Sequence, residues 1–175
     1  MAGYRFFMAT DLKLVGPIDI DYHDAKAAKC ILTENKKEFL DRLDKHGLAA
    51  KQGCYVFAMR SGKGFTPWYV GKATKTMRQE CMTQDKRAKF ALVFAQGIHG
   101  SPVMFFVVPE GTKNKVPNKI CDEIETELIQ YALSKNPELL NVQKTSVPEW
   151  SIDGVIRGKQ KPTNEERDFK VMMGI

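Results

Sequence analysis

The sequence predicts a domain of mixed helices and strands, and three patterns lead to this prediction. Two short apolar runs, Cys54–Met59 and Trp68–Val70, flank the turn-rich stretch Ser61–Pro67, an arrangement typical of a β-hairpin. A third run, Val103–Val108, is apolar throughout and bounded by turn residues, which indicates a strand buried on both faces. Apolar residues then recur at helical spacing over residues 118–134 and predict a long helix.

Length and composition are those of one globular domain with additional segments. The chain has 175 residues, of which 43% are hydrophobic and 27% charged. Its apolar runs are shorter than the roughly 20 residues that span a bilayer, and the apolar part of its N-terminus is too short for a signal peptide. Four scattered cysteines without a Cys-x-x-Cys pair indicate reduced thiols and a cytoplasmic protein. The net charge of +6 favours a polyanionic partner such as nucleic acid.

The residues before the hairpin are expected to form an extension without a functional assignment. A helix is expected near 34–46, because apolar residues recur there at helical spacing. Two stretches before it, Tyr4–Met8 and Leu12–Val15, are candidate strands, and Gly16-Pro17 is expected to be a turn.

A basic segment directly follows the second run of the hairpin. Between residues 72 and 89, six basic residues accompany two acidic ones. The basic residues are Lys72, Lys75, Arg78, Lys86, Arg87 and Lys89. A charged segment is most simply a solvated surface. Its position beside the hairpin makes a phosphate-binding surface for DNA the competing interpretation.

Glu125 has an unusual position in the predicted helix. Its neighbours three and four positions away are mostly apolar, so its side chain is expected on the buried face. Burial of an unpaired carboxylate is costly. A partner is therefore expected, and the sequence leaves open whether it is an arginine, a backbone donor or a metal ion.

Four segments of the chain resemble, in the same order, the signature of the GIY-YIG nuclease superfamily. These are Gly53-Cys54-Tyr55, Tyr69-Val70-Gly71, Glu125–Ile129 and Pro137–Asn141. They are similar to the Gly-Ile-Tyr and Tyr-Ile-Gly tripeptides of the family, its helical glutamate followed by Leu-Ile, and its later proline and asparagine. The resemblance implies an α/β fold with a small, mainly antiparallel three-stranded sheet flanked by helices. The strands would lie near 53–60, 67–72 and 103–108.

The resemblance also divides the chain into three parts. Residues 51–145 would form the nuclease-like domain, and residues 1–50 would be an N-terminal extension. Residues 146–175 would form a C-terminal extension packed on the same domain. Within the latter, Thr163 and Glu166 have the spacing of a capping box, which predicts a final helix.

The function implied by the resemblance is that of an endonuclease that hydrolyses DNA phosphodiester bonds with a divalent metal ion. Glu125 would hold Mg²⁺ or Mn²⁺, and magnesium prefers oxygen ligands and keeps several waters. Tyr55 would orient or deprotonate the attacking water, with its pKa depressed by Lys72 or by the metal. Tyr69 would hydrogen-bond a phosphate oxygen or the nucleophile. Asn141 would fix the geometry of the site.

The arginine of the family has two possible counterparts in this chain. Arg78 lies seven residues after Gly71, close to the family position, and could clamp a phosphate. Aligning Met77 with the apolar helix residue of the family would instead place Glu80 there. Two alternatives to an active endonuclease therefore stay open. One is a catalytically weak or inactive DNA-binding protein on the same scaffold, and the other is an interaction protein in which these side chains are structural.

Overall fold

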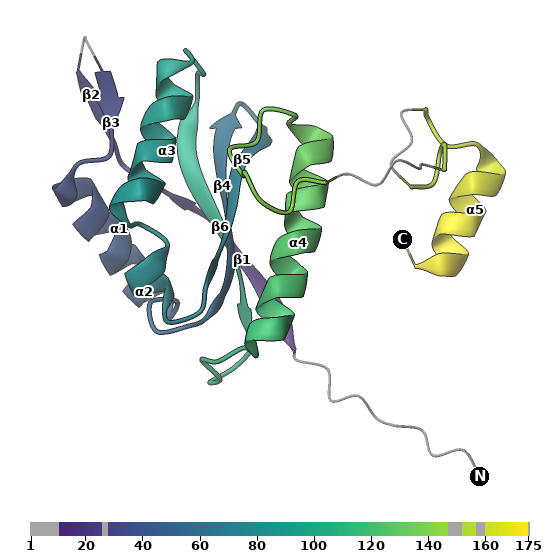
Figure 1. The fold of residues 1–175 in the computed structure, drawn as a ribbon, viewed down its shortest axis with the longest axis horizontal. Helices are drawn as coiled ribbons and strands as arrows, with labels where there is room; N and C mark the ends of the chain where they lie inside the picture. Colours follow the sequence, from purple (N-terminus) through teal and green to yellow (C-terminus); the bar gives the residue numbers. More distant parts are fainter. Residues whose placement is uncertain (1–10, 26–27, 147–151, 157–159, 175) are drawn as a thin grey trace. The chain divides into compact units, whose positions relative to one another are not determined.

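The computed structural model describes residues 11–25, 28–146, 152–156 and 160–174 in two units, Met1–Lys144 and Thr145–Ile175. The candidate strand Tyr4–Met8 lies outside the described residues. The first unit is an α/β structure with an antiparallel sheet between two layers of helices (Figure 1). This result confirms the predicted combination of helices with a mainly antiparallel sheet.

The sheet of the first unit has the strand order β1–β6–β4–β5 and is antiparallel throughout. Its strands are β1 (Leu12–Asp19), β4 (Gly53–Ser61), β5 (Gly64–Ala73) and β6 (Ser101–Pro109). A separate two-stranded ribbon consists of β2 (His23–Ala25) and β3 (Ala28–Cys30). The three expected strands are present, but the sheet has four strands because β1 joins it.

The strand β1 makes the N-terminal residues an integral part of the sheet. It pairs with β6 from Leu12 opposite Pro109 to Asp19 opposite Val103. The expected turn at Gly16-Pro17 lies inside this strand, where the register shifts between Val15 and Ile18. Because β1 and β4 flank β6, β6 is a central strand, as its apolar sequence predicted.

The strands β4 and β5 form the predicted hairpin with a tighter turn than expected. Ser61 pairs with Gly64, so that only Gly62 and Lys63 connect the two strands. Gly62 has a φ of 57°, a left-handed conformation that glycine adopts without steric cost. The rest of the expected turn, residues 64–67, belongs to β5.

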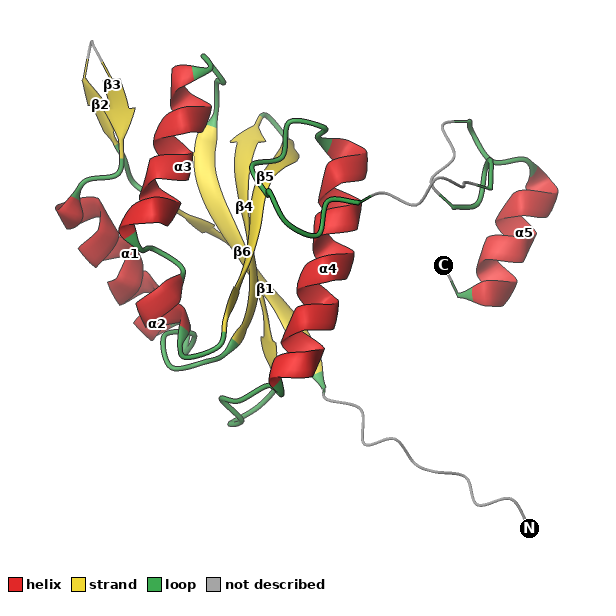
Figure 2. Cartoon of the chain, viewed as in Figure 1, coloured by secondary structure: helices red, strands yellow, loops and turns green. Residues whose placement is uncertain are grey.

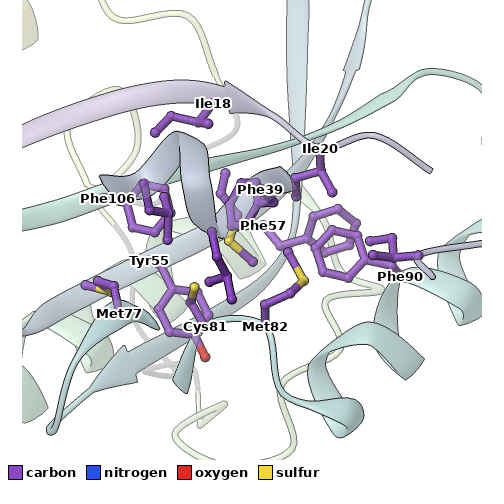
Figure 3. Close-up of a cluster of buried hydrophobic side chains, with 14 of the residues drawn as sticks. Ile18, Ile20, Phe39, Tyr55, Phe57, Met77, Cys81, Met82, Phe90 and Phe106 are labelled. Atoms are coloured by element: carbon purple, nitrogen blue, oxygen red, sulfur yellow. The ribbon is translucent and has the colours of Figure 1, made fainter. Parts of the chain in front are cut away.

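Helices cover both faces of the sheet (Figure 2). One face carries α1 (Thr33–Lys45), α2 (Met77–Glu80) and α3 (Gln84–Ala95), and the other carries α4 (Asn118–Lys135). The larger core cluster fills the first face and includes Phe39, Tyr55, Phe57, Met77, Phe90 and Phe106 (Figure 3). A smaller cluster lies under α4 and contains Val70, Ile129, Ala132 and Leu139. Each face of the sheet therefore packs against its own hydrophobic cluster.

A buried lysine fixes the connection between β6 and α4. Lys51 is only 6% exposed. Its Nζ donates to the carbonyl oxygens of Pro109, Gly111 and Lys113 at 3.0, 3.0 and 2.7 Å. Because an ammonium group has three donors, these contacts compensate its burial. The chain thus uses a lysine to hold three backbone oxygens together.

The second unit contains the helix α5 (Asn164–Met173). The hydroxyl of Thr163 accepts a hydrogen bond from the backbone of Glu166, whose carboxylate accepts one from the backbone of Thr163 at 2.7 Å. This geometry confirms the predicted capping box. Across the described ranges of both units, none of the helices combines the length and apolar character needed to cross a membrane.

Candidate functional site

The residues of the signature gather around β5, an outer strand of the sheet, but they lie on both of its faces. Successive side chains of a strand point to opposite faces. Tyr69 contacts α3 on one face, whereas Lys72 contacts α4 on the other. In β4, Tyr55 belongs to the larger core cluster, while Cys54 donates from Sγ to the backbone oxygen of Cys121 in α4. The sheet therefore separates the two tyrosines from Glu125.

Tyr55 is a core residue with no exposed surface. Its ring belongs to the cluster that contains Met77 and Cys81 (Figure 3). A Cβ atom added at Gly71 would lie 2.5 Å from both Cζ and Oη of this ring. The hydroxyl donates a long hydrogen bond of 3.5 Å to the backbone oxygen of Glu80. The glycine of Tyr69-Val70-Gly71 thus makes room for the tyrosine of Gly53-Cys54-Tyr55.

The surroundings of Tyr55 keep its hydroxyl protonated. Burial raises the pKa of Tyr55 far above its usual value, and the neighbouring Tyr69, Cys81, Asp85 and Glu80 raise this pKa further. A general base must lose its proton near the working pH and must reach the water that it activates. Tyr55 meets neither condition in this arrangement.

Glu80, and not Arg78, contacts Tyr55. Met77 is buried in the core, which places the apolar residue of α2 as the second alignment requires. Arg78 points toward α1 and forms an ion pair with Asp44. The backbone oxygen of Glu80 accepts the hydrogen bond of Tyr55. Arg78 is therefore directed away from Tyr55, whereas the backbone of Glu80 contacts the hydroxyl of Tyr55.

Tyr55→Phe is expected to lower the free energy of unfolding by less than about 1 kcal/mol, because it removes only one long hydrogen bond. Urea denaturation measures this difference. A Tyr55→Phe protein that loses clearly more than this would contradict the expectation.

Glu125 lies on the opposite face in the ion-pair cluster, which consists of Lys72, Asp122, Glu125 and Lys144. Its side chain is 13% exposed, and its Oε2 lies 2.7 Å from Nζ of Lys144 and 3.5 Å from Nζ of Lys72. Asp122, one turn earlier in α4, pairs with the same two lysines. The expected partner of Glu125 is therefore present, but it is a pair of lysines and not an arginine or a backbone donor.

The charges of this cluster reinforce each other. A hydrogen bond from Lys72 and a second one from Lys144 lower the pKa of Asp122. The hydrogen bond to Asp122 also raises the pKa of Lys72. Burial acts to lower the pKa of Lys144, but hydrogen bonds to Glu125 and Asp122 outweigh it and raise this pKa. All three of these groups therefore stay ionised at neutral pH.

The donor set of the cluster does not fit the magnesium or manganese ion that the resemblance implies. The carboxylates of Asp122 and Glu125 are already engaged by two ammonium groups, which would repel a divalent cation. Throughout the described part of the chain, no group of three or more His, Cys, Asp or Glu side chains could hold a metal ion.

Asn141 closes the outer edge of β5. Its Oδ1 accepts from the backbone nitrogen of Val70 at 2.9 Å, and its Nδ2 donates to the oxygen of Val70 at 2.8 Å. The neighbouring Leu140 donates its backbone N–H to the oxygen of Trp68 at 2.8 Å. The amide group thus supplies both contacts that a further strand would make. It ties the segment that leads to Lys144 to the sheet.

Tyr69 lies beside two lysines of α3. Nζ of Lys86 is 5.0 Å and Nζ of Lys89 is 4.7 Å from the centre of its ring, within the range of cation–π contacts. Lys89 also donates to the backbone oxygen of Leu140 at 3.3 Å, and Lys86 pairs with Asp85. Burial, together with the charge of Lys86, lowers the pKa of Lys89. These two ammonium groups beside a half-buried ring form the Tyr69–lysine cluster.

The other predicted DNA-binding residues do not join the Tyr69–lysine cluster. Arg78 is paired with α1, and Nη1 of Arg87 donates to the backbone oxygen of Ile31 at 3.3 Å. Lys72 belongs to the ion-pair cluster on the other face. Lys75 is exposed in the turn before α2. The predicted basic segment is therefore divided among several surfaces.

Two members of the ion-pair cluster, Asp122 and Lys144, were not predicted from the sequence. Asp122 precedes Glu125 by three positions, and this spacing places both carboxylates on neighbouring parts of one helix face. Lys144 lies in a polar segment after α4 without apolar periodicity, so no sequence pattern indicates its position.

Comparisons with known proteins do not identify a family for this chain. The chain matches no protein-family model, no curated protein and no solved structure. The resemblance to the GIY-YIG superfamily stays a prediction from the sequence.

Proposed function

We propose that the chain is a DNA-binding protein on a GIY-YIG-like scaffold and that it is catalytically weak or inactive. The observation that carries this proposal is the arrangement around β5. The Tyr69–lysine cluster offers positive charge beside an aromatic ring. The groups that would perform hydrolysis are engaged elsewhere, because Tyr55 is buried and protonated and Glu125 is held by two lysines.

The proposed contact surface consists of Tyr69, Lys86 and Lys89. Lysine side chains that neutralise phosphates release condensed counterions from DNA, and this release dominates non-specific affinity. A half-buried aromatic ring adds a flat surface for a sugar or an unpaired base. The net charge of +6 adds attraction at longer range. Binding through such a surface depends little on sequence, because phosphate contacts carry no base information.

DNA affinity is expected to fall as salt rises, with a log–log slope of about −0.9 for each phosphate contacted. Lys86→Gln and Lys89→Gln are each expected to make this slope less steep by about one contact. Fluorescence anisotropy of a labelled duplex over a salt series measures the effect. Lys37→Gln, which changes an exposed lysine of α1, serves as the control and should leave the slope unchanged. Affinity that does not respond to salt would contradict the proposal.

Endonuclease activity is the second candidate function. It is favoured by the position of Lys72, Glu125 and Asn141 around the same strand. Hydrolysis with a metal ion would require the carboxylate of Glu125 to exchange its two lysine partners for a cation. Incubation with supercoiled plasmid, with and without magnesium, separates the candidates. Magnesium-dependent nicking by the wild type, lost in a folded Glu125→Gln variant, would favour the endonuclease.

A further inference from the structure

Three oxygen atoms of α4 converge on one ammonium group. Nζ of Lys144 lies 2.7 Å from Oε2 of Glu125, 3.2 Å from Oδ1 of Asp122 and 3.2 Å from the backbone oxygen of Asp122. Carboxylate and backbone oxygens are also the ligands that hard divalent cations take in proteins. In this chain the ammonium group of Lys144 lies within 3.2 Å of all three oxygens.

The backbone of Lys144 is held in an uncommon conformation. Its φ of 60° lies in the left-handed region, and no other non-glycine residue in the described ranges has a positive φ. A residue with a Cβ atom adopts this conformation only where its surroundings stabilise it. The backbone oxygen of Lys144 accepts from Nε2 of Gln130 in α4 at 2.7 Å, and Asn141 ties the preceding segment to β5. These contacts hold the lysine against the helix.

Lys72 balances the charge of the second carboxylate in the ion-pair cluster. Nζ of Lys72 pairs with Asp122 and lies 3.5 Å from Glu125. The two ammonium groups and the two carboxylates of the cluster together carry no net charge. A divalent ion added to this neutral group would meet two positive charges at close range. The cluster is therefore electrically neutral without an ion.

We propose that Lys144 is a tethered cation that takes the place of a divalent ion at Asp122 and Glu125. The two carboxylates then anchor the segment after α4 to this helix, much as Lys51 holds the segment before it. The inference goes beyond DNA binding, because it concerns the face of the sheet opposite the Tyr69–lysine cluster. It has a direct consequence: removal of the lysine charge converts the three oxygens into a cation site.

Lys144→Met tests this consequence, because methionine removes the charge while filling similar space. The full-length variant is expected to bind one Mn²⁺ ion at least about tenfold more tightly than the wild type, since one ammonium group no longer repels the ion. Electron paramagnetic resonance of free Mn²⁺ measures the affinity. Mn²⁺ is also expected to raise the melting temperature of Lys144→Met, because binding to the folded state alone stabilises it. Neither effect is expected in the double variant Lys144→Met/Glu125→Gln.

Two control variants define the specificity of the effect. Lys144→Arg keeps the positive charge and is expected to bind Mn²⁺ no better than the wild type. Lys119→Met removes an exposed lysine of α4, whose Nζ lies 3.9 Å from Oε1 of Glu123. This variant is expected to bind Mn²⁺ like the wild type.

Three results would overturn the proposal. The first is Mn²⁺ binding to Glu125 in the wild type as tight as in Lys144→Met, and the second is no gain of binding in Lys144→Met. If Lys144→Met does not fold in metal-free buffer, folding restored by Mn²⁺ supports the tethered cation. Failure to fold at every Mn²⁺ concentration is the third result against it.

Discussion

Gly71→Ala is expected to lower the free energy of unfolding by about 3 kcal/mol, because the added methyl group overpacks a filled core. Its Cβ would lie 2.5 Å from Cζ and Oη of Tyr55, a ring with no exposed surface. The ring can move only by displacing neighbours in the same cluster, such as Met77 and Cys81. Urea denaturation measures the loss.

A second substitution shows whether the loss comes from this contact. In a Tyr55→Leu background the ring is absent, so Gly71→Ala should cost clearly less than in the wild type. Gly64→Ala is a matched control in the same strand, where the nearest atom to the added Cβ is the backbone oxygen of Ser61 at 3.8 Å. It should change stability by no more than about 0.5 kcal/mol. Equal costs in both Tyr55 backgrounds would show that the two residues are not coupled.

Glu125→Gln is expected to destabilise the protein by about 2 kcal/mol, because charge-assisted hydrogen bonds are lost from a mostly buried carboxylate. Lys144 and Lys72 would keep their charges but lose one of their two acidic partners. The lysine side chains are 29% and 30% exposed, so that water offsets part of this loss. Chemical denaturation at neutral pH measures the difference.

Glu123→Gln and Glu127→Gln provide matched controls in α4. Both side chains are exposed, and Glu123 has only a long contact of 3.9 Å with Lys119. Each change is expected to alter stability by less than about 0.5 kcal/mol. A Glu125→Gln protein as stable as these controls would show that the ion-pair cluster contributes nothing to folding.

The elements of the fold that depend on local patterns could be predicted from the sequence. The hairpin, the central strand and α4 each show the apolar spacing of their own element. The strand β1 was not counted in the sheet, because Gly16-Pro17 resembles a turn and its partner Pro109 is distant in the chain. Strand pairing over such a distance leaves no mark in a local pattern. For the same reason the sequence did not predict that β1 is the fourth strand of the sheet.

Only part of the candidate site was predictable from the sequence, because Lys72 and Glu125 were expected but Asp122 and Lys144 were not. Spacing placed Glu125 on the buried side of its helix, and the structure agrees. Its partners come from β5 and from the segment after α4, whose approach depends on the tertiary fold. One signal was available in the sequence: Tyr69 and Lys72 are an odd number of positions apart in one strand. Their side chains are therefore expected on opposite faces.

Each of the two outer strands of the sheet has a feature that interrupts its free edge. An exposed strand edge is a template for intermolecular pairing and fibril growth. At β5, Asn141 and Leu140 already occupy the groups of Val70 and Trp68. At β1, Pro17 lacks an N–H donor, and the strand is irregular between Val15 and Ile18. These features make edge-to-edge pairing between copies of the chain less favourable at these positions of both outer strands.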